Sequence, residues 1–328
     1  MDYWREKGRL AGIECGAERE SLDLWKPHLP ESIRVEAKVH IRVPAFAVQK
    51  IKESLLQNRI PFKILIPNIQ KLLDSNIAKS SGKSEYDYTR YHTMEEIYRW
   101  MNQISVNYSQ LVTKYLLGKT YESRPIYCLK ISWPSNKTKK IFWMDCGVHG
   151  REWISPAFCQ WFVKEILESP PSYQKLRKTL QNIDLYILPV LNIDGYIYTW
   201  TTDRLWRKSR SPHKHGCFGT DLNRNFDAEW CTVGASTDCL SHVFCGTSPG
   251  SEPETKAIIN FMESRKSDVL CYLSIHSYGQ LIIIPYAYGS QANNHKELVN
   301  VAREAATALK KIHGTSYKVG PFATSLCS

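Results

Sequence analysis

The chain has 328 residues, 43% of them hydrophobic, which suits one large α/β unit with a small extra domain. Its formal net charge is +11, but Lys and Arg are dispersed and no nucleic-acid-binding motif accompanies them, so a solvated basic surface is favoured over a nucleic-acid partner. No apolar run reaches the roughly 18 to 20 residues of a transmembrane span, and residues 1–20 are polar, without the apolar core of a signal peptide.

Residues 21–76 predict a small α+β domain after the polar segment 1–20. The expected elements, in chain order, are a strand at Leu22–Trp25, a strand at Ile33–Val43, a helix at Ala47–Asn58, a strand at Phe62–Leu65 and a helix at Ile69–Asp74. A polar, Gly- and Ser-rich connector then covers residues 77–85 and includes Lys79 and Lys83. This connector is either an ordinary interdomain loop or a segment open to proteolysis.

From residue 86 to residue 328, helical runs alternate with short apolar strands. The expected strands include Tyr127–Ile131, Ile141–Met144, Leu185–Val190, Leu270–Ile275 and Leu281–Pro285. This alternation predicts an α/β fold, with a mixed, mostly parallel sheet and helices on both faces.

Two of these strands end close to potential metal ligands. The run Ile141–Val148 leads directly to His149, with Glu152 three residues later, and the run Val269–Ile275 leads directly to His276. In open α/β sheets the ligand crevice lies beyond the carboxyl ends of the strands. His149, Glu152 and His276 can therefore hold a zinc ion through three protein ligands, an arrangement typical of catalytic rather than structural zinc. The alternative is a hydrogen-bonded histidine and a carboxylate at a helix N-terminus.

The same H-x-x-E spacing occurs at His92 and Glu95, where a different interpretation is favoured. Thr93 and Glu96 have the spacing of a capping box at the start of an amphipathic helix. His92 is therefore predicted to be a helix-entry residue that binds no metal.

The chain has ten cysteines, four of which lie in one loop-rich stretch: Cys217, Cys231, Cys239 and Cys245. They are typical of a disulfide framework in an oxidising compartment, and a structural zinc cluster is the weaker explanation because Cys-x-x-Cys spacing is absent. This conflicts with the lack of a signal peptide, so we expect the true N-terminus to be missing or misassigned. The sequons Asn107–Ser109 and Asn136–Thr138 would be usable in the secretory pathway, although short sequons also occur by chance.

Six segments in the same order resemble zinc metallocarboxypeptidases of the pancreatic A/B type, the M14 family. They are Asp145–Trp153, Pro189–Tyr196, Asp203–Lys208, Gly219–Phe226, Ser251–Glu254 and Ser274–Tyr278. The resemblance runs from about Leu22 to Ala323, and Asn192–His213 is most similar to the carboxypeptidase O branch. One small departure is Gly150, where many relatives have Ala.

The resemblance implies a zinc-dependent metallocarboxypeptidase that binds one zinc ion and releases single C-terminal amino acids from peptides. Residues 21–76 would be a ferredoxin-like propeptide, residues 77–85 an activation linker cut by a trypsin-like protease, and residues 86–328 the catalytic domain. The location implied is extracellular or secretory. The expected partners are peptide or protein C-termini, and the expected state is a monomer.

The family motifs also assign roles to individual residues. Arg207 corresponds to the arginine that stabilises the developing oxyanion, and Asn223 with Arg224 to the pair that binds the substrate carboxylate. Other substrate-contact positions are Arg151, Arg204, Ser277 and Tyr278. The implied disulfides are Cys146–Cys159, Cys217–Cys239 and Cys231–Cys245, which leaves Cys15, Cys128, Cys271 and Cys327 free.

The C-terminus departs from the family pattern. Relatives have a late glutamate that takes the proton from the attacking water, and a tyrosine that closes over the substrate. Alignment of Tyr317–Gly320 places Cys327 at the tyrosine position, and no glutamate follows Glu304. We therefore expect that the chain is C-terminally truncated and inactive. For the complete protein, a preference for acidic C-terminal residues is implied only by the carboxypeptidase O resemblance.

Two non-enzymatic alternatives stay open from the sequence. One is an inactive variant that still binds zinc or peptide C-termini. The other is a disulfide-linked secreted binding module in which the metal residues are vestigial. Zinc content separates the second alternative from the others, and turnover separates the enzyme from the inactive variant.

Overall fold

The computed structural model describes residues 23–26, 33, 37–76, 86–169 and 178–321. The chain divides into two compact units, residues 70–278 and residues 1–69 with 279–328. The polar segment 1–20 and the predicted connector 77–85 lie outside the described residues.

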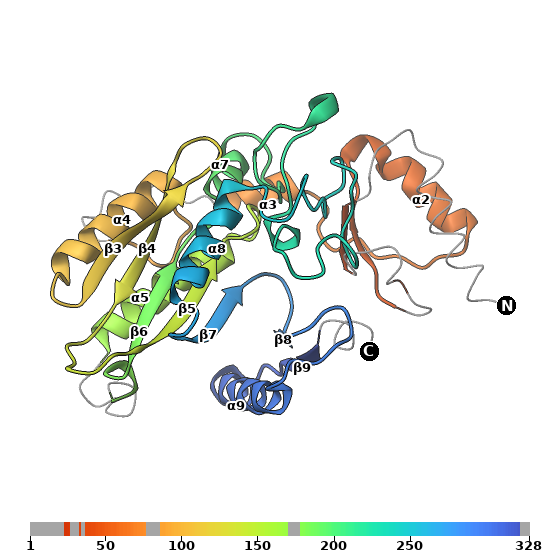
Figure 1. Cartoon of the computed structure of the whole chain (residues 1–328). Helices are drawn as coiled ribbons and strands as arrows, with labels where there is room; N and C mark the ends of the chain where they lie inside the picture. The colour runs from red at the N-terminus through yellow and green to blue at the C-terminus, as the bar shows by residue number, and fades with distance from the viewer. Residues whose placement is uncertain (1–22, 27–32, 34–36, 77–85, 170–177, 322–328) are drawn as a thin grey trace. The chain divides into compact units, whose positions relative to one another are not determined.

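The unit of residues 70–278 contains a five-stranded sheet in the order β3-β4-β6-β5-β7 (Figure 1). Its strands are β3 (Val112–Lys119), β4 (Pro125–Ile131), β5 (Lys140–Cys146), β6 (Ile183–Leu188) and β7 (Val269–Ile275). β3 pairs with β4 and β4 with β6 in antiparallel fashion, whereas β5 pairs in parallel with both β6 and β7. The predicted mixed sheet is confirmed.

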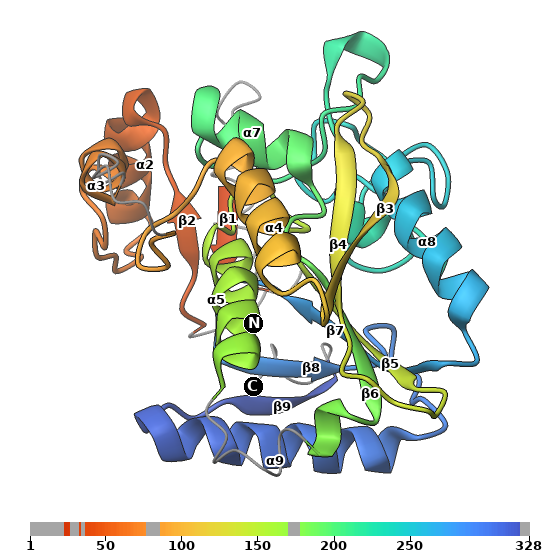
Figure 2. The same cartoon turned by 90° about the vertical axis from the view of Figure 1, so that its left-hand side faces the viewer.

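Helices cover both faces of this sheet, as the sequence predicted. They are α4 (Met94–Asn107), α5 (Ile154–Glu168), α7 (Ile193–Thr201) and α8 (Pro253–Arg265). On β5, Trp143 contacts Phe261 of α8 with ring centroids 4.8 Å apart, while Cys146 is bonded to Cys159 of α5. Because side chains alternate along a strand, these contacts place α8 and α5 on opposite faces (Figure 2).

The predicted start of α4 is confirmed. The Thr93 side chain accepts from the Glu96 N–H and the Glu96 side chain accepts from the Thr93 N–H, which completes a capping box before Met94. The apolar face of the helix is buried against the sheet core through Ile97, Trp100, Met101 and Ile104.

The N-terminal part of the other unit contains β1 (Asp23–Lys26), antiparallel to β2 (His40–Arg42). A 3₁₀ turn at Ala45–Ala47 leads into α2 (Val48–Gln57), whose buried residues form a small core with the hydrophobic side chains around β2. α3 (Ile69–Asn76) follows along the chain and begins at the boundary with the unit of residues 70–278. Both helices predicted in this part of the sequence are present.

Two strand predictions in this part were inaccurate. Of the strand expected at Ile33–Val43, only His40–Arg42 is strand among the described residues. The strand expected at Phe62–Leu65 is absent from the structure, and its apolar side chains are exposed. Pro61 and Pro67 flank this run, and proline restricts its neighbours and lacks the N–H donor that a sheet requires, which accounts for the missing pairing.

The C-terminal part of the same unit is a β-α-β element. β8 (Leu281–Ile284) pairs in parallel with β9 (Lys318–Pro321), and α9 (His295–His313) connects them. α9 ends at Gly314, whose φ of 71° is the left-handed conformation that glycine adopts readily. The predicted strand at Leu281–Pro285 is therefore present.

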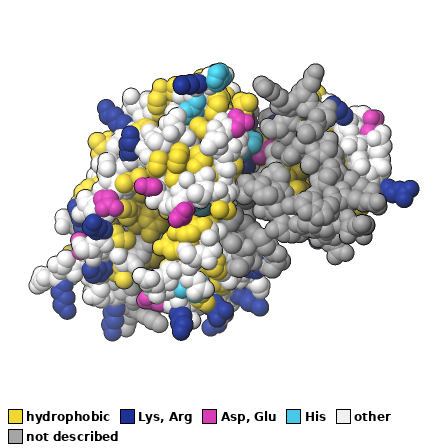
Figure 3. Space-filling model, turned by 45° about the vertical axis from the view of Figure 1, so that its right-hand side comes forward, with side chains coloured by type: hydrophobic (Ala, Val, Ile, Leu, Met, Phe, Trp, Pro, Cys, Tyr) yellow, Lys and Arg dark blue, Asp and Glu magenta, His cyan; other side chains and the backbone are white. Residues whose placement is uncertain are grey.

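Two features of the described residues bear on membranes and on nucleic acids. No described helix is long and apolar enough to cross a membrane. Lys and Arg side chains on that face are scattered among hydrophobic and uncharged ones (Figure 3). This distribution fits the dispersed positive charge inferred from the sequence.

A buried carboxyl group lies at the start of α8. Glu254 is 0% exposed, its Oε1 accepts from the Tyr121 N–H at 3.0 Å, and its Oε2 has no hydrogen-bond partner among the described residues. Burial raises the pKa of Glu254 to about 7, and the nearby Asp194 also raises it. The carboxyl group is therefore stable in its neutral form inside the protein.

We predict that this proton makes stability depend on pH. The pKa of Glu254 is raised in the folded state, so its protonation stabilises the folded protein. This stabilisation is complete below the unfolded pKa near 4.5 and is lost as pH rises to about 7. Thermal melts at pH 5 and pH 8 should show this loss in the parent, on the order of 2 to 3 kcal/mol. The Glu254→Gln variant, which mimics the neutral form, should have a smaller difference. An equal difference in both proteins would show that Glu254 is ionised when folded.

Candidate metal centre

The sheet brings two histidines to one edge. β5 ends at Cys146 and β7 ends at Ile275, and these two residues are direct partners in the parallel ladder. His276 follows β7 at once, and His149 follows β5 after the turn at Gly147. Gly147 has a φ of 64°, and a Cβ there would lie 3.1 Å from a side-chain carbon of Pro156. A side chain at this position would therefore disturb the turn that delivers His149.

Three ligand atoms converge at this edge. The Nδ1 of His149 lies 2.7 Å from Glu152 Oε1, and the Nδ1 of His276 lies 3.2 Å from Glu152 Oε2. The two Nδ1 atoms are 3.2 Å apart. Ligands about 2.0 Å from a tetrahedral zinc ion are roughly 3.3 Å from one another, so the donor set and its spacing fit zinc. Within the part of the chain that the structure describes, this is the group of His, Cys, Asp and Glu side chains that could hold a metal.

The far nitrogens of both histidines are held by other side chains. His149 Nε2 lies 3.1 Å from Oδ1 of the fully buried Asp221. His276 Nε2 lies 3.1 Å from Ser274 Oγ, which donates to Asp145 Oδ1 at 2.6 Å. Contacts of this kind fix the tautomer and the orientation of a metal-binding imidazole, so that both Nδ1 atoms face the same point.

Positive groups offset the buried carboxylates. Asp221 Oδ2 accepts from Arg207 Nε at 3.1 Å and from Arg207 Nη2 at 2.8 Å, while Arg207 Nη1 lies 3.7 Å from Glu152 Oε1. Burial favours the neutral acids, but Arg207 and His149 outweigh it at Asp221 and hold its pKa well below the ordinary value. Burial likewise opposes ionisation of Glu152, but His149 and His276 hold its pKa well below the ordinary value. Both acids are therefore carboxylates.

Arg224 lies near the same charges. Its Nε donates to the Gly234 carbonyl at 2.6 Å, and its Nη1 donates to the carbonyl of the exposed Asn223 at 3.0 Å. Burial lowers the pKa of Arg224, and the attraction of Asp221 opposes this shift. The sequence predicted that Arg224, Asn223 and Arg207 belong to one site. In the structure Arg207 is hydrogen-bonded to Asp221, the Asn223 N–H donates to Asp221, and Arg224 is attracted by its charge.

Arg151 and Arg204 are engaged with each other. Arg204 lies over the Trp153 ring at 3.7 Å and its Nη1 donates to the Arg151 carbonyl at 2.8 Å. Burial lowers the pKa of Arg204 to about 10. Arg151 donates to the Leu205 carbonyl at 3.4 Å. Their predicted substrate contacts stay predictions.

The other two predicted contact residues follow His276. The Ser277 N–H donates to Glu152 Oε2 at 3.1 Å, so its backbone supports a proposed metal ligand. The Tyr278 side chain is 52% exposed. A role of either residue toward substrate stays a prediction.

The second H-x-x-E pair forms no such centre. His92 is buried, its ring stacks on Tyr86 with centroids 3.9 Å apart, and its Nε2 lies 2.8 Å from the Asp87 carbonyl oxygen. Glu95 is exposed. His92 is thus a hydrogen-bonded histidine beside a helix start, in agreement with the interpretation of the sequence.

Disulfides join the same pairs that the family resemblance implied. They are Cys146–Cys159, Cys217–Cys239 and Cys231–Cys245. Cys128 is buried and free, Cys271 is free, and Cys15 and Cys327 lie outside the described residues. The last two bonds cross-link the long segment between α7 and α8 that carries Arg207, Asp221 and Arg224.

Ser274 and Asp145, which support His276, were not singled out by the sequence, and neither was Asp221. It stood inside the segment Gly219–Phe226, without a role of its own. Its contact with His149 joins positions 72 residues apart, so no local spacing reveals it. A carboxylate two residues before Asn223 was the available signal.

Comparison with known proteins agrees with this geometry. Residues 97–328 match the family model described as zinc carboxypeptidase, and residues 14–76 match the model described as carboxypeptidase activation peptide. The chain belongs to the zinc carboxypeptidase family. This family uses zinc, and the His149, Glu152 and His276 group is suited to hold it.

Individual relatives support the same assignment. The chain is 60% identical to carboxypeptidase O of Bos taurus over 259 residues, which covers 78% of this chain and 69% of the relative. It is 59% identical to carboxypeptidase O of Homo sapiens over the same shares of both chains. A crystal structure of thrombin activatable fibrinolysis inhibitor is similar with a TM-score of 0.90 and 40% identity, over 98% of this chain and 81% of that one. The predicted metallocarboxypeptidase fold is confirmed.

We predict that Asp221→Ala destabilises the protein by about 3 to 5 kcal/mol, because the change removes the carboxylate that lies 2.8 Å from the buried Arg207. Urea unfolding with a chelator present measures this effect apart from metal binding. Asp227→Ala is the matched control, since Asp227 is exposed on the same segment. Equal unfolding midpoints for the two variants would contradict the role given to the buried charges.

Proposed function

We propose that this protein is a zinc-dependent carboxypeptidase that removes single residues from peptide C-termini, and that His149, Glu152 and His276 hold the zinc. The observation that carries the proposal is the convergence of three ligand atoms within 4.8 Å at adjacent strand ends. Asp221 and Ser274 orient the two histidines from behind.

Zinc bound there supplies Lewis acidity toward the scissile peptide group. Arg207 adds positive charge beside it, because its Nη1 faces Glu152 at 3.7 Å while its Nε and Nη2 are held by Asp221. A guanidinium fixed in this way can stabilise negative charge that develops on the carbonyl oxygen without reorganising during the reaction. Asp221 is thus a positioning residue for both Arg207 and His149.

The free carboxylate of the substrate requires its own partner. Arg224 is the proposed anchor, because a guanidinium matches a carboxylate with two parallel hydrogen bonds, and the exposed amide of Asn223 can add a donor. The electrostatic interaction of Arg224 with Asp221 and Arg207 supports this proposal. Arg151, Arg204, Ser277 and Tyr278 are proposed to shape the surrounding cleft.

Finer features of the function are also proposals. The match of residues 14–76 to an activation peptide supports a zymogen, in which a trypsin-like protease cuts within residues 77–85 and releases the domain from 86 onward. The similarity to carboxypeptidase O supports a preference for acidic C-terminal residues. Three disulfides support an extracellular or secretory location. A monomer is proposed.

We predict that His276→Ala removes stoichiometric zinc. The parent should contain about one zinc per chain by metal analysis after dialysis, and the variant should contain almost none, because two ligands hold zinc far more weakly than three. His92→Gln is the control, since His92 has the same H-x-x-E spacing but different contacts. Unchanged zinc in His276→Ala would show that the ligand assignment is wrong.

We predict that Arg224→Ala weakens binding of peptides with a free C-terminus by roughly 10- to 100-fold, and that Arg224→Lys restores only part of it, because Lys lacks the planar fork. Peptides with an amidated C-terminus should bind weakly to parent and variant alike. Arg99→Ala, an exposed arginine on α4, serves as the control. Fluorescence titration measures these affinities independently of turnover.

Release of amino acids from the same peptides then decides between enzyme and inactive binder. Chelator-sensitive release from substrates that end in Glu, compared with Lys and Phe, would establish catalysis and test the acidic preference. Binding that depends on Arg224 without any release would instead favour the inactive variant.

A further inference from the structure

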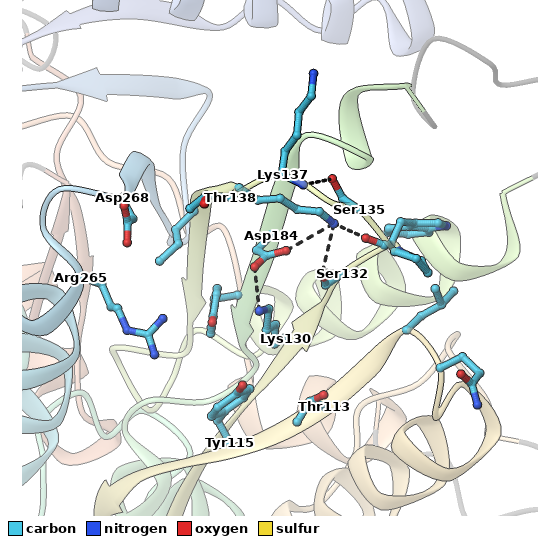
Figure 4. Close-up of a pocket in the computed structure, with 17 residues that line it drawn as sticks. Thr113, Tyr115, Lys130, Ser132, Ser135, Lys137, Thr138, Asp184, Arg265 and Asp268 are labelled. Carbon is cyan, nitrogen blue, oxygen red and sulfur yellow. Dashed lines mark hydrogen bonds and ion pairs between the residues drawn. The ribbon is translucent and has the colours of Figure 1, made fainter.

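A polar pocket, drawn in Figure 4, lies near the start of β5, whereas the proposed metal centre lies beyond the end of that strand. Its volume is about 570 Å³, within the range of pockets that hold small organic ligands. Ile141 near the start of β5 lines it, whereas His149 follows the end of the same strand. The seven residues of β5 separate the two places by roughly 20 Å. The pocket is therefore not a part of the peptidase site.

The charged groups at the base of this pocket are paired with one another. Asp184 Oδ2 lies 2.7 Å from Lys130 Nζ, and Asp184 Oδ1 lies 3.6 Å from Lys139 Nζ. Lys139 also donates to Ser132 Oγ at 3.1 Å and to the Trp133 carbonyl. The two inner lysines therefore share one carboxylate, which offsets part of the positive charge of the lining.

The rest of the lining combines aromatic rings with hydroxyl groups. Tyr115 and Trp133 provide ring surface, and Tyr115 is 37% exposed. Thr113, Ser135 and Thr138 add hydroxyl groups that can both donate and accept (Figure 4). A sugar ring has apolar C–H faces that pack on aromatic rings and hydroxyl groups that need hydrogen-bond partners. The lining therefore suits a saccharide better than a purely apolar ligand.

A glycosylation sequon forms the rim of the same pocket. In Asn136-Lys137-Thr138, Asn136 is exposed, and Ser135, Lys137 and Thr138 all line the pocket. The sequon lies in the irregular loop between β4 and β5, where an acceptor asparagine is accessible. The other sequon begins at Asn107, the last residue of α4, and none of its residues lines this pocket.

We propose that Asn136 carries an N-linked glycan and that the first sugars of this glycan lie in the adjacent pocket. The donor is a lipid-linked oligosaccharyl diphosphate of the secretory pathway. A bond forms between the amide nitrogen of Asn136 and C1 of the first sugar, the bond from C1 to the diphosphate breaks, the amide loses a proton and the lipid diphosphate leaves. The attached glycan then covers the amino end of β5 and leaves the opposite edge open to peptides.

The proposal rests on the secretory location proposed above, so the test first establishes that step. The full chain is expressed behind an added signal peptide in mammalian cells that keep glycans in the high-mannose form. Peptide mapping of the secreted protein should show Cys231 joined to Cys245 and a glycan on Asn136 that Asn136→Gln removes. A secreted, disulfide-bonded chain with unmodified Asn136 would overturn the proposal, whereas failure of secretion in the parent would count against the location.

Contact between the glycan and the pocket is tested with an endoglycosidase that cleaves the bond between the two innermost sugars. The glycan on Asn136 should be trimmed about tenfold more slowly in the native protein than in the denatured protein, as expected if roughly one tenth of the molecules present it freely. Tyr115→Ala should abolish this protection while the melting temperature shows that the variant is folded. Any glycan on Asn107 is the internal control and should be trimmed equally fast in both states. Equal rates for Asn136 in native and denatured protein would overturn the proposal.

Discussion

The parallel pairing of β5 with β7 is the constraint on which the candidate centre depends. Asp145 and Ser274 are direct partners in this ladder, and their side chains are hydrogen-bonded at 2.6 Å. The same serine contacts the ring of His276, so the register and the orientation of the histidine are fixed together. A slip of one residue would turn Ser274 to the other face of the sheet and would separate His276 from His149.

The long segment between α7 and α8 supplies the charges, although it contains almost no regular structure. Asp221 is anchored there by its N–H, which donates to the Phe244 carbonyl at 2.9 Å. The disulfide Cys217–Cys239 closes a loop that contains Asp221, and Cys231–Cys245 closes a second loop that follows it. Cross-links of this kind reduce the number of conformations open to the unfolded chain. They therefore stabilise a segment that has few regular backbone hydrogen bonds of its own.

The sequence predicted those features that depend on local patterns. The apolar run before His149 and the capping box before Met94 are periodic or short-range signals, and the structure agrees with them. Asp221 was missed because its role arises from contacts across 72 positions. The strand at Phe62–Leu65 was wrong because strand formation requires a partner, and an apolar composition alone does not specify one.

The two edges of the sheet have different chemical requirements. Beyond the carboxyl ends of β5 and β7, buried carboxylates and imidazoles must stay rigid, because a metal centre tolerates little displacement of its ligands. At the amino end of β5, the loop from Ser132 to Lys139 only needs to return the chain from β4, so it can vary in sequence and accept additions. A bulky group on Asn136 therefore changes the surface and solubility of the protein without straining the register on which His149 and His276 depend.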